Sequence, residues 1–299
     1  MCRPRPRNSC AIRWCSKVRE AGYLVYDVFT DTRFGGNQLA VFPDATGLPE
    51  DRLQAIAAEF NFSEVTFVYP PADPAHSARV RIFTPTVEVP FAGHPTIGTA
   101  IALAGLGRGA DLVLELGVGP IPCKVGPHGA EFTTPVPLQI IAHPPVSLIA
   151  AALGLPESSI VTTTHAPVQA SLGLAFVLVE LDARATLARA APVVEVLKKA
   201  AEAYPAGLDF AIFCYVRQGE AVDARMFAPL DNMPEDPATG SASATLAALL
   251  ASLPGGPQRL AITQGQDMGR LSQIAVSVGP DGVTVRGQAV KVMAGTLYL

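Results

Sequence analysis

Two stretches of the sequence, half a chain apart, repeat each other. Arg81–Pro85 reads RIFTP and Arg225–Pro229 reads RMFAP, at an offset of 144 residues. A second pair follows, in which His94–Ala100 reads HPTIGTA and Asp236–Ala242 reads DPATGSA, at an offset of 142 residues. One copy of a motif in each half of a chain predicts an internal duplication, with one domain for each copy.

Each copy of the motif leads into a predicted helix that is apolar on nearly every side, Ile101–Leu106 and Thr245–Leu253. A helix of this kind has to be enclosed by protein. Short runs of β-branched and aromatic residues predict strands around it, for example Tyr23–Phe29, Val65–Tyr69 and Ala78–Phe83. We therefore predict an α+β fold of two pseudo-symmetric domains. Each domain is a curled, mostly antiparallel, barrel-like sheet around a central apolar helix.

The sequence also suggests where the domains divide. Residues 1–22 are rich in arginine and lie outside the predicted fold. Prolines between residues 135 and 145 interrupt regular structure. We therefore expect a first domain at 23–140 and a second at 141–299. The final strand, Gln288–Leu299, could pair with either half.

Composition and charge exclude several classes of partner. The chain has 22 Lys and Arg against 26 Asp and Glu, a net charge of −4, and no basic stripe, which argues against nucleic acid and anionic membranes. No apolar run reaches the roughly 18 residues of a membrane span. Outside residues 1–22 only Cys123 and Cys214 occur, too few for a disulfide framework or a metal-ligand spacing. We expect a cytoplasmic protein.

The absence of cofactor motifs limits the types of reaction that the protein could catalyse. The sequence has no glycine-rich nucleotide loop, no dinucleotide fingerprint, no histidine pair at zinc spacing and no Gly-x-Ser-x-Gly elbow. The sequence therefore predicts proton transfer without a metal or a cofactor.

The duplicated motif supplies the candidate site residues. His94 and Asp236 occupy matched places in the two copies, so we expect them to be neighbours in a cleft between the domains, where they suit acid–base chemistry. Gly98-Thr99 and Gly240-Ser241 are predicted to begin the two apolar helices. A helix start attracts a carboxylate or phosphate. We interpret Thr99 as a helix cap and Gly240-Ser241 as ligand-binding.

Glu64 is the third candidate, in the segment Asn61–Thr66 between a helix and a strand. Packing against Phe62 and Phe67 would raise its pKa by desolvation, although a solvated loop glutamate fits the sequence equally well. Asn37 follows Gly36 in a predicted turn, where asparagine is common, so we interpret it as structural.

These motifs together resemble the phenazine-biosynthesis PhzF-like family, from about Tyr23 to the C-terminus. Gln38 and Val65 depart from the family pattern. The segments that carry the resemblance are Phe34–Val41, Asn61–Glu64, Arg81–Pro85, Pro90–Pro95 and Glu235–Ala242.

The resemblance implies a diaminopimelate-epimerase-like fold with the active site between two domains, and a homodimer. It implies an isomerase that needs no cofactor and moves a proton within a small carboxylate resembling dihydro-hydroxyanthranilate. Glu64 matches the family's catalytic acid, and His94 and Asp236 match its partners. The family residues that contact the substrate carboxylate match Gly93, Gly240 and Ser241.

Two alternatives stay open at this point. A catalytically silent protein could keep the cleft and bind a small ligand, or an enzyme of the same fold could be an epimerase or lyase. Racemases of this fold use one cysteine in each repeated motif, and neither copy here contains one. The residue types therefore exclude a two-thiol racemase.

Overall fold

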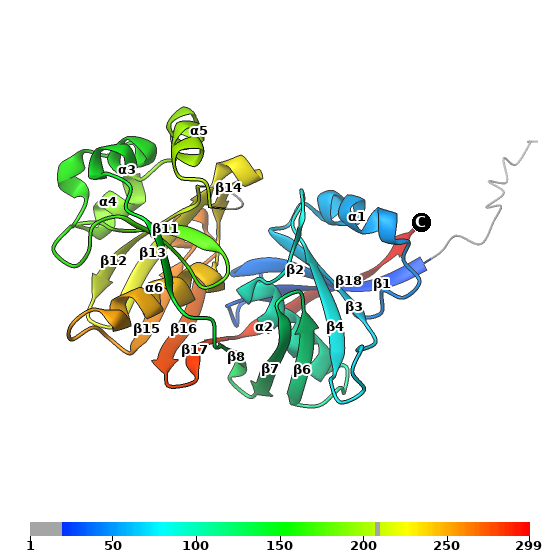
Figure 1. Cartoon of the computed structure of the whole chain (residues 1–299). Helices are drawn as coiled ribbons and strands as arrows, with labels where there is room; N and C mark the ends of the chain where they lie inside the picture. The colour runs from blue at the N-terminus through cyan, green and yellow to red at the C-terminus, as the bar shows by residue number, and fades with distance from the viewer. Residues whose placement is uncertain (1–19, 207–209) are drawn as a thin grey trace, which may run out of the picture.

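The computed structural model of the protein describes residues 20–206 and 210–299. Its strands form one continuous network of pairs, arranged as two similar halves that lie side by side (Figure 1). The predicted α+β fold of two pseudo-symmetric curled sheets is confirmed. The first strand begins at Glu20, three residues before the predicted start at Tyr23. Residues 1–19 of the expected N-terminal extension lie outside the described residues.

The first half contains β1 to β8 with helices α1 and α2. Its strand pairs are antiparallel except β2 with β3 and β4 with β6, which are parallel. The elements are β1 (Glu20–Val28), β2 (Asn37–Phe42), α1 (Leu53–Phe60), β3 (Glu64–Tyr69), β4 (Ala78–Phe83), β5 (Glu88–Val89), α2 (Gly93–Gly105), β6 (Asp111–Leu116), β7 (Gly119–Gly126) and β8 (Gly129–Thr134).

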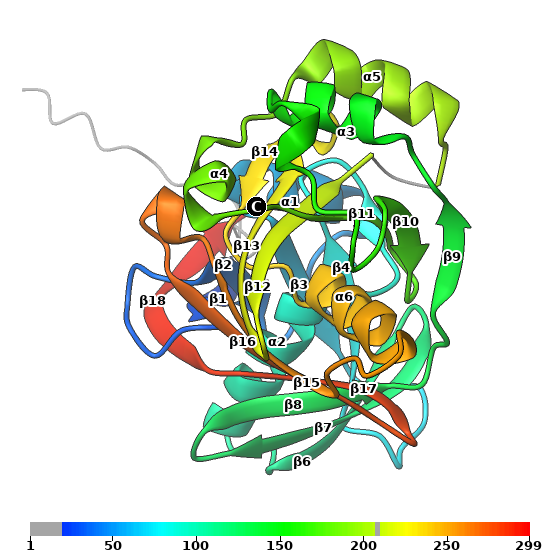
Figure 2. The same ribbon diagram turned by 90° about the vertical axis from the view of Figure 1, so that its left-hand side faces the viewer.

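The second half repeats this order, and its parallel pairs are β11 with β12 and β13 with β15. Its helices α3 and α5 pack together on the outer side of the sheet (Figure 2). The elements are β9 (Gln139–Ala142), α3 (Val146–Leu153), β10 (Val168–Ser171), β11 (Ala175–Glu180), α4 (Arg184–Arg189), α5 (Val194–Ala203), β12 (Ile212–Gln218), β13 (Ala221–Ala228), β14 (Met233–Asp236), α6 (Gly240–Ser252), β15 (Arg259–Gln264), β16 (Ser272–Gly279) and β17 (Gly282–Gly287).

Strand pairing joins the two halves. β8 pairs with β17, so one sheet passes into the other. β9 pairs with β10 at the far edge of the second half. The final strand, β18 (Ala289–Tyr298), runs back to the first half and pairs antiparallel with β1 (Figure 1). This answers the question of the last strand, while the division at residues 140 and 141 stays a prediction.

The two apolar helices lie inside the curled sheets. Ile97 and Leu103 of α2 and Leu246 and Leu250 of α6 are almost fully buried and belong to one hydrophobic core. α2 contacts β1, β2, β7 and β8, and α6 contacts β11, β15, β16 and β17. No helix in the described part of the chain is long and apolar enough to cross a membrane.

Two local predictions were wrong. α2 begins at Gly93 and not near Ile101, so Pro95 lies in the first turn of the helix as its third residue. A proline in the first turn costs no hydrogen bond, so it does not break the helix there. Gly98-Thr99 therefore do not begin a helix. Thr99 is not a cap, and its hydroxyl donates to Thr66 Oγ1 at 3.0 Å.

Candidate active site

The N-terminal ends of α2 and α6 meet where the two halves join. Gly93 and Gly240 are the first residues of these helices. A Cβ added to Gly93 would lie 3.1 Å from Cα of Gly240, so the close approach requires glycine. Within the described chain no side chain caps either helix start by a hydrogen bond. The first N–H groups of a helix lie at the positive end of its dipole, and two such ends together favour an anionic ligand group.

Glu64 is the first residue of β3, and its side chain turns toward α2. Its Oε2 lies 3.2 Å from Nδ1 of His94, in the first turn of that helix. The prediction that Phe67 packs against Glu64 is wrong. Side chains alternate along a strand, so Phe67 joins the core under α1 while Glu64 and Thr66 lie on the opposite face.

The environments of these two groups shift their pKa values in opposite directions. Burial raises the pKa of Glu64 well above its usual range, and the nearby Asp236 charge raises it further. Burial lowers the pKa of His94 to about 3. The imidazole is therefore neutral at physiological pH, and its Nε2 is buried with no hydrogen-bond partner among the described residues.

Asp236 ends β14 and is held by three donors from different parts of the chain. Its Oδ1 accepts from Ser63 Oγ and from Asn37 Nδ2, both at 2.8 Å. Its Oδ2 accepts from Thr239 Oγ1 at 2.5 Å. Burial raises the pKa of Asp236 to about 6, although the three donors oppose the shift. Three donors around one carboxyl group favour its ionised form.

The structure brings Glu64, His94 and Asp236 together, as expected, although not through matched places in the repeat. Val89 pairs with Ile82 as Asp236 pairs with Met226, so Asp236 corresponds to Val89 and not to His94. The offset is 144 residues at β4 and β13 but 147 at the helix starts, Gly93 and Gly240. A 3-10 turn, Pro229–Asp231, lengthens the second copy between β13 and β14.

Asn37 belongs to the site, which the sequence interpretation missed. Its Nδ2 donates to Asp236 Oδ1 and to the Ala238 carbonyl at 3.0 Å, and lies 3.4 Å from His94 Nδ1. The preceding Gly36 has φ +61°, and a Cβ there would meet the Val28 carbonyl oxygen at 2.3 Å. Glycine adopts this turn without strain, and the turn directs Asn37 across the interface between the halves. The contact spans 199 residues, so local turn chemistry gave no sign of it.

Gln264 was also missed, and it fixes the order of hydrogen bonds around Asp236. Its Oε1 accepts from the Thr239 N–H at 3.0 Å. Its Nε2 donates to the Asp236 carbonyl at 2.8 Å and to Thr239 Oγ1 at 3.0 Å. The Thr239 hydroxyl hydrogen is thereby directed to the Asp236 carboxylate. Gln264 is fully buried on β15, which explains why an amide rather than a charged group is tolerated there.

A cavity of about 160 Å³ opens onto these residues. Its polar lining consists of Glu64, Thr84, Asp231, Asp236, Thr239 and Ser241. Most of the remaining lining is apolar, including Val89, Leu174, Phe176, Met226 and Met233. The cavity combines a desolvated carboxyl pair, an apolar surface and a helix start, which suits proton transfer on a small ligand. Among the described residues no three His, Cys, Asp or Glu side chains are grouped to bind a metal, and cofactor independence stays a prediction.

Comparison with known proteins places this site in a family. A family model described as "Phenazine biosynthesis-like protein" matches residues 26–295. An uncharacterized isomerase, mll1393, of Mesorhizobium japonicum is 40% identical, and the alignment covers 94% of this chain and 100% of that protein. The trans-2,3-dihydro-3-hydroxyanthranilate isomerase of Pseudomonas aeruginosa is 35% identical, over 93% of this chain and 99% of the relative.

A solved structure agrees at the level of the fold. The Bacillus anthracis phenazine biosynthesis protein superposes with a TM-score of 0.82, at 24% identity, over 94% of this chain and 100% of the other. The chain therefore belongs to the phenazine biosynthesis-like family and is an isomerase of that family, with the diaminopimelate-epimerase-like fold that its sequence predicted.

Proposed function

We propose that the protein shifts a proton within a small carboxylate, and that its substrate is trans-2,3-dihydro-3-hydroxyanthranilate or a close analogue. The observation that carries this proposal is Glu64, a largely buried carboxyl group with a raised pKa that lines a cavity of ligand size. The 35% identity to an enzyme named for that substrate supports the choice of compound.

The proton movement follows from the position of Glu64. In its carboxylate form, Glu64 removes a proton from one carbon of the substrate, and the C–H electron pair enters the conjugated system. The same group then returns the proton to another carbon, so the product is an isomer and Glu64 is regenerated. The raised pKa of Glu64 makes its carboxylate a stronger base for this task than an exposed glutamate.

The other residues bind and orient the substrate. The N–H groups at Gly93, Gly240 and Ser241 would donate hydrogen bonds to the substrate carboxylate at the converging helix starts. Neutral His94 stays within 3.2 Å of Glu64 and would orient its carboxyl group. Asp236, kept ionised by its three donors, would bind a polar substituent of the substrate. The apolar lining excludes water that would compete for the proton.

Turnover of trans-2,3-dihydro-3-hydroxyanthranilate, followed by absorbance, tests the proposal. We expect conversion to an isomer of unchanged mass, with no added metal or cofactor. In D2O, mass spectrometry of the product reports whether the proton is returned internally or exchanged. Absence of turnover at any pH from 5 to 9, by a protein shown to be folded, would refute this substrate.

A further inference from the structure

The duplicated motif contains an arginine and a glutamate whose role the proposed reaction does not use. In the first half, Arg81 on β4 forms a forked ion pair with Glu88, with N–O distances of 2.7 and 2.6 Å. In the second half, Arg225 on β13 forms the same pair with Glu235, at 2.8 and 2.7 Å. The pairs occupy corresponding places, but their neighbours differ. Glu88 precedes the apolar Val89, whereas Glu235 precedes Asp236.

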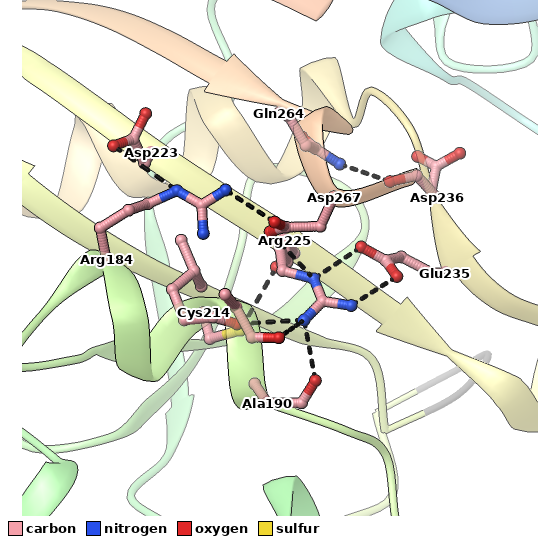
Figure 3. A network of polar contacts seen from close by, with 11 residues as sticks. Arg184, Ala190, Cys214, Asp223, Arg225, Glu235, Asp236, Gln264 and Asp267 are labelled. Carbon is pink, nitrogen blue, oxygen red and sulfur yellow. Dashed lines mark hydrogen bonds and ion pairs between the residues drawn. The ribbon is translucent and has the colours of Figure 1, made fainter. Parts of the chain in front are cut away.

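Arg225 makes far more contacts than a surface ion pair needs. Its side chain is only 11% exposed, and it packs over the Phe227 ring at 4.8 Å from the ring centre. Its Nη1 donates to three carbonyls at the C-terminal end of α4 (Figure 3). These carbonyls belong to Leu187, Ala188 and Ala190, at 3.0, 3.2 and 2.8 Å. The guanidinium group therefore connects α4 to the strand that contains Asp236.

β14 needs such support because its backbone pairing is weak. Only two of its residues pair with β13, Asp236 with Met226 and Met233 with Ala228, and the register shifts between them. The Arg225–Glu235 ion pair adds a side-chain connection between the same two strands. In Figure 3 the Glu235 carboxylate turns toward Arg225, while the Asp236 carbonyl accepts from Gln264 on the other side.

Asp236 is also sensitive to the charges around it. Glu64 from β3 and the adjacent Glu235 interact with its charge, and Asn37 links it to His94 of α2. Asp231, before β14, lines the same cavity, so three of these four titratable groups are acids. Arg225 supplies the positive charge beside Glu235. Farther out, Asp267 lies 3.8 Å from Arg225 Nε and pairs with Arg184, which also contacts Asp223 (Figure 3).

We propose that Arg225 is a positioning residue for Asp236: it holds Glu235, and with it the end of β14, and it neutralises the carboxylate next to the site. Arg81 occupies the same place in the first half and pairs with Glu50 as well as Glu88. The residue there that corresponds to Asp236 is Val89, whose apolar side chain has no charge to tune. The duplication thus kept one ion pair twice and gave the second copy a role in the site. The effect of Arg225 on the protonation of Asp236 does not depend on the proposed function. Only its effect on turnover rests on that function.

The physical consequence is a shift in the protonation of Asp236. The Glu235 charge already raises the pKa of Asp236, which is about 6. Without the Arg225 guanidinium this charge would act uncompensated, so the pKa of Asp236 would rise further. Removing the Glu235 charge while Arg225 stays would have the opposite effect, because Asp236 would then have a positive neighbour.

The test measures Asp236 itself and needs no substrate. The ligand-free protein is labelled with 13C at aspartate carboxyl carbons, the Asp236 signal is assigned by its loss in Asp236→Asn, and its titration is followed by NMR. For Arg225→Met we expect the pKa of Asp236 to rise by about one pH unit. Glu235→Gln should lower it, and the double variant Arg225→Met/Glu235→Gln should return it close to the wild-type value.

Arg81→Met is the matched control, since it breaks the equivalent ion pair in the first half and should leave the Asp236 titration unchanged. An unchanged pKa in a folded Arg225→Met protein, or an equal rise in Arg81→Met, would overturn the proposal. If Arg225→Met does not fold, Glu235→Gln decides the matter, because an unchanged Asp236 titration there would also overturn it. Turnover of trans-2,3-dihydro-3-hydroxyanthranilate by the same variants is a separate measurement, whose failure in the wild type would bear on the proposed function alone.

Discussion

Substitution of Gly93 by alanine tests whether the meeting of the two helix starts determines the geometry of the site. The new Cβ would lie 3.1 Å from Gly240 Cα and C and from Ser241 N, all of them backbone atoms. Ordinary contacts of a Cβ begin at 3.4 Å, so α2 and α6 would have to separate by at least a few tenths of an ångström. Backbone cannot rotate away as a flexible side chain can.

We expect two effects of Gly93→Ala. Overpacking at a site this tight costs about 1–3 kcal/mol of folding free energy. Because α2 contains His94, the separation also moves the imidazole away from Glu64, now 3.2 Å distant. A displacement of 1 Å can cost about a hundredfold in rate, so one a third as large should lower kcat by roughly fivefold.

The assay combines thermal unfolding with turnover, and Gly105→Ala is the control. Gly105 ends the same helix, and a Cβ there would lie 3.7 Å from the Tyr26 hydroxyl, an ordinary contact. We expect Gly105→Ala to leave kcat unchanged and stability unchanged or slightly higher. Wild-type turnover and melting temperature in Gly93→Ala would refute the argument that the helix starts are in essential close contact.

Three further predictions concern the surroundings of the site. Asn37→Ala removes a donor to the Asp236 carboxylate, so the pKa of Asp236 should rise in an NMR titration, and stability should fall by about 1–3 kcal/mol. The folded-state pKa of His94, about 3, lies below its unfolded value of 6.5, so His94 contributes stability that is present above pH 6.5 and lost as pH falls toward 3. In denaturant unfolding, the free energy of unfolding of His94→Gln should therefore fall less steeply than that of the wild type between pH 6.5 and 3, by roughly 1.4 kcal/mol per pH unit. The same slope in both proteins would contradict a buried neutral imidazole. Arg270→Met removes the ion-pair partner that lies 2.7 Å from the buried Asp27 carboxylate. The free energy of unfolding should fall by about 2–3 kcal/mol in the same assay, less than for a fully buried pair because Arg270 is partly exposed.

The sequence predicted the architecture because the duplication was visible in it. The motif at Arg81 and Arg225 located β4 and β13, and the apolar runs after it located the cores of α2 and α6. The start of α2 was placed too late, because the prediction followed the apolar run from Ile101, whereas the helix begins at Gly93 and includes Pro95 in its first turn.

The sequence indicated the two carboxyl groups and the histidine that the structure brings together, but not the groups that orient them. Asn37 and Gln264 reach Asp236 from strands in different halves, and their amides look ordinary in a local reading. The three-residue change of offset also hid that Asp236 corresponds to Val89. Contacts of this kind depend on the curvature of the sheets and on how the halves join, which local patterns do not encode.

The most direct test of the central claim, that Glu64 moves the proton, compares Glu64→Gln with Glu59→Gln. Both remove one carboxyl group without changing side-chain volume, but Glu59 is an exposed residue of α1. With trans-2,3-dihydro-3-hydroxyanthranilate as substrate, we predict that Glu64→Gln stays folded and loses at least about a hundredfold in kcat, while Glu59→Gln retains wild-type turnover. Turnover by Glu64→Gln within a few-fold of wild type would contradict the claim and assign the proton transfer to another group.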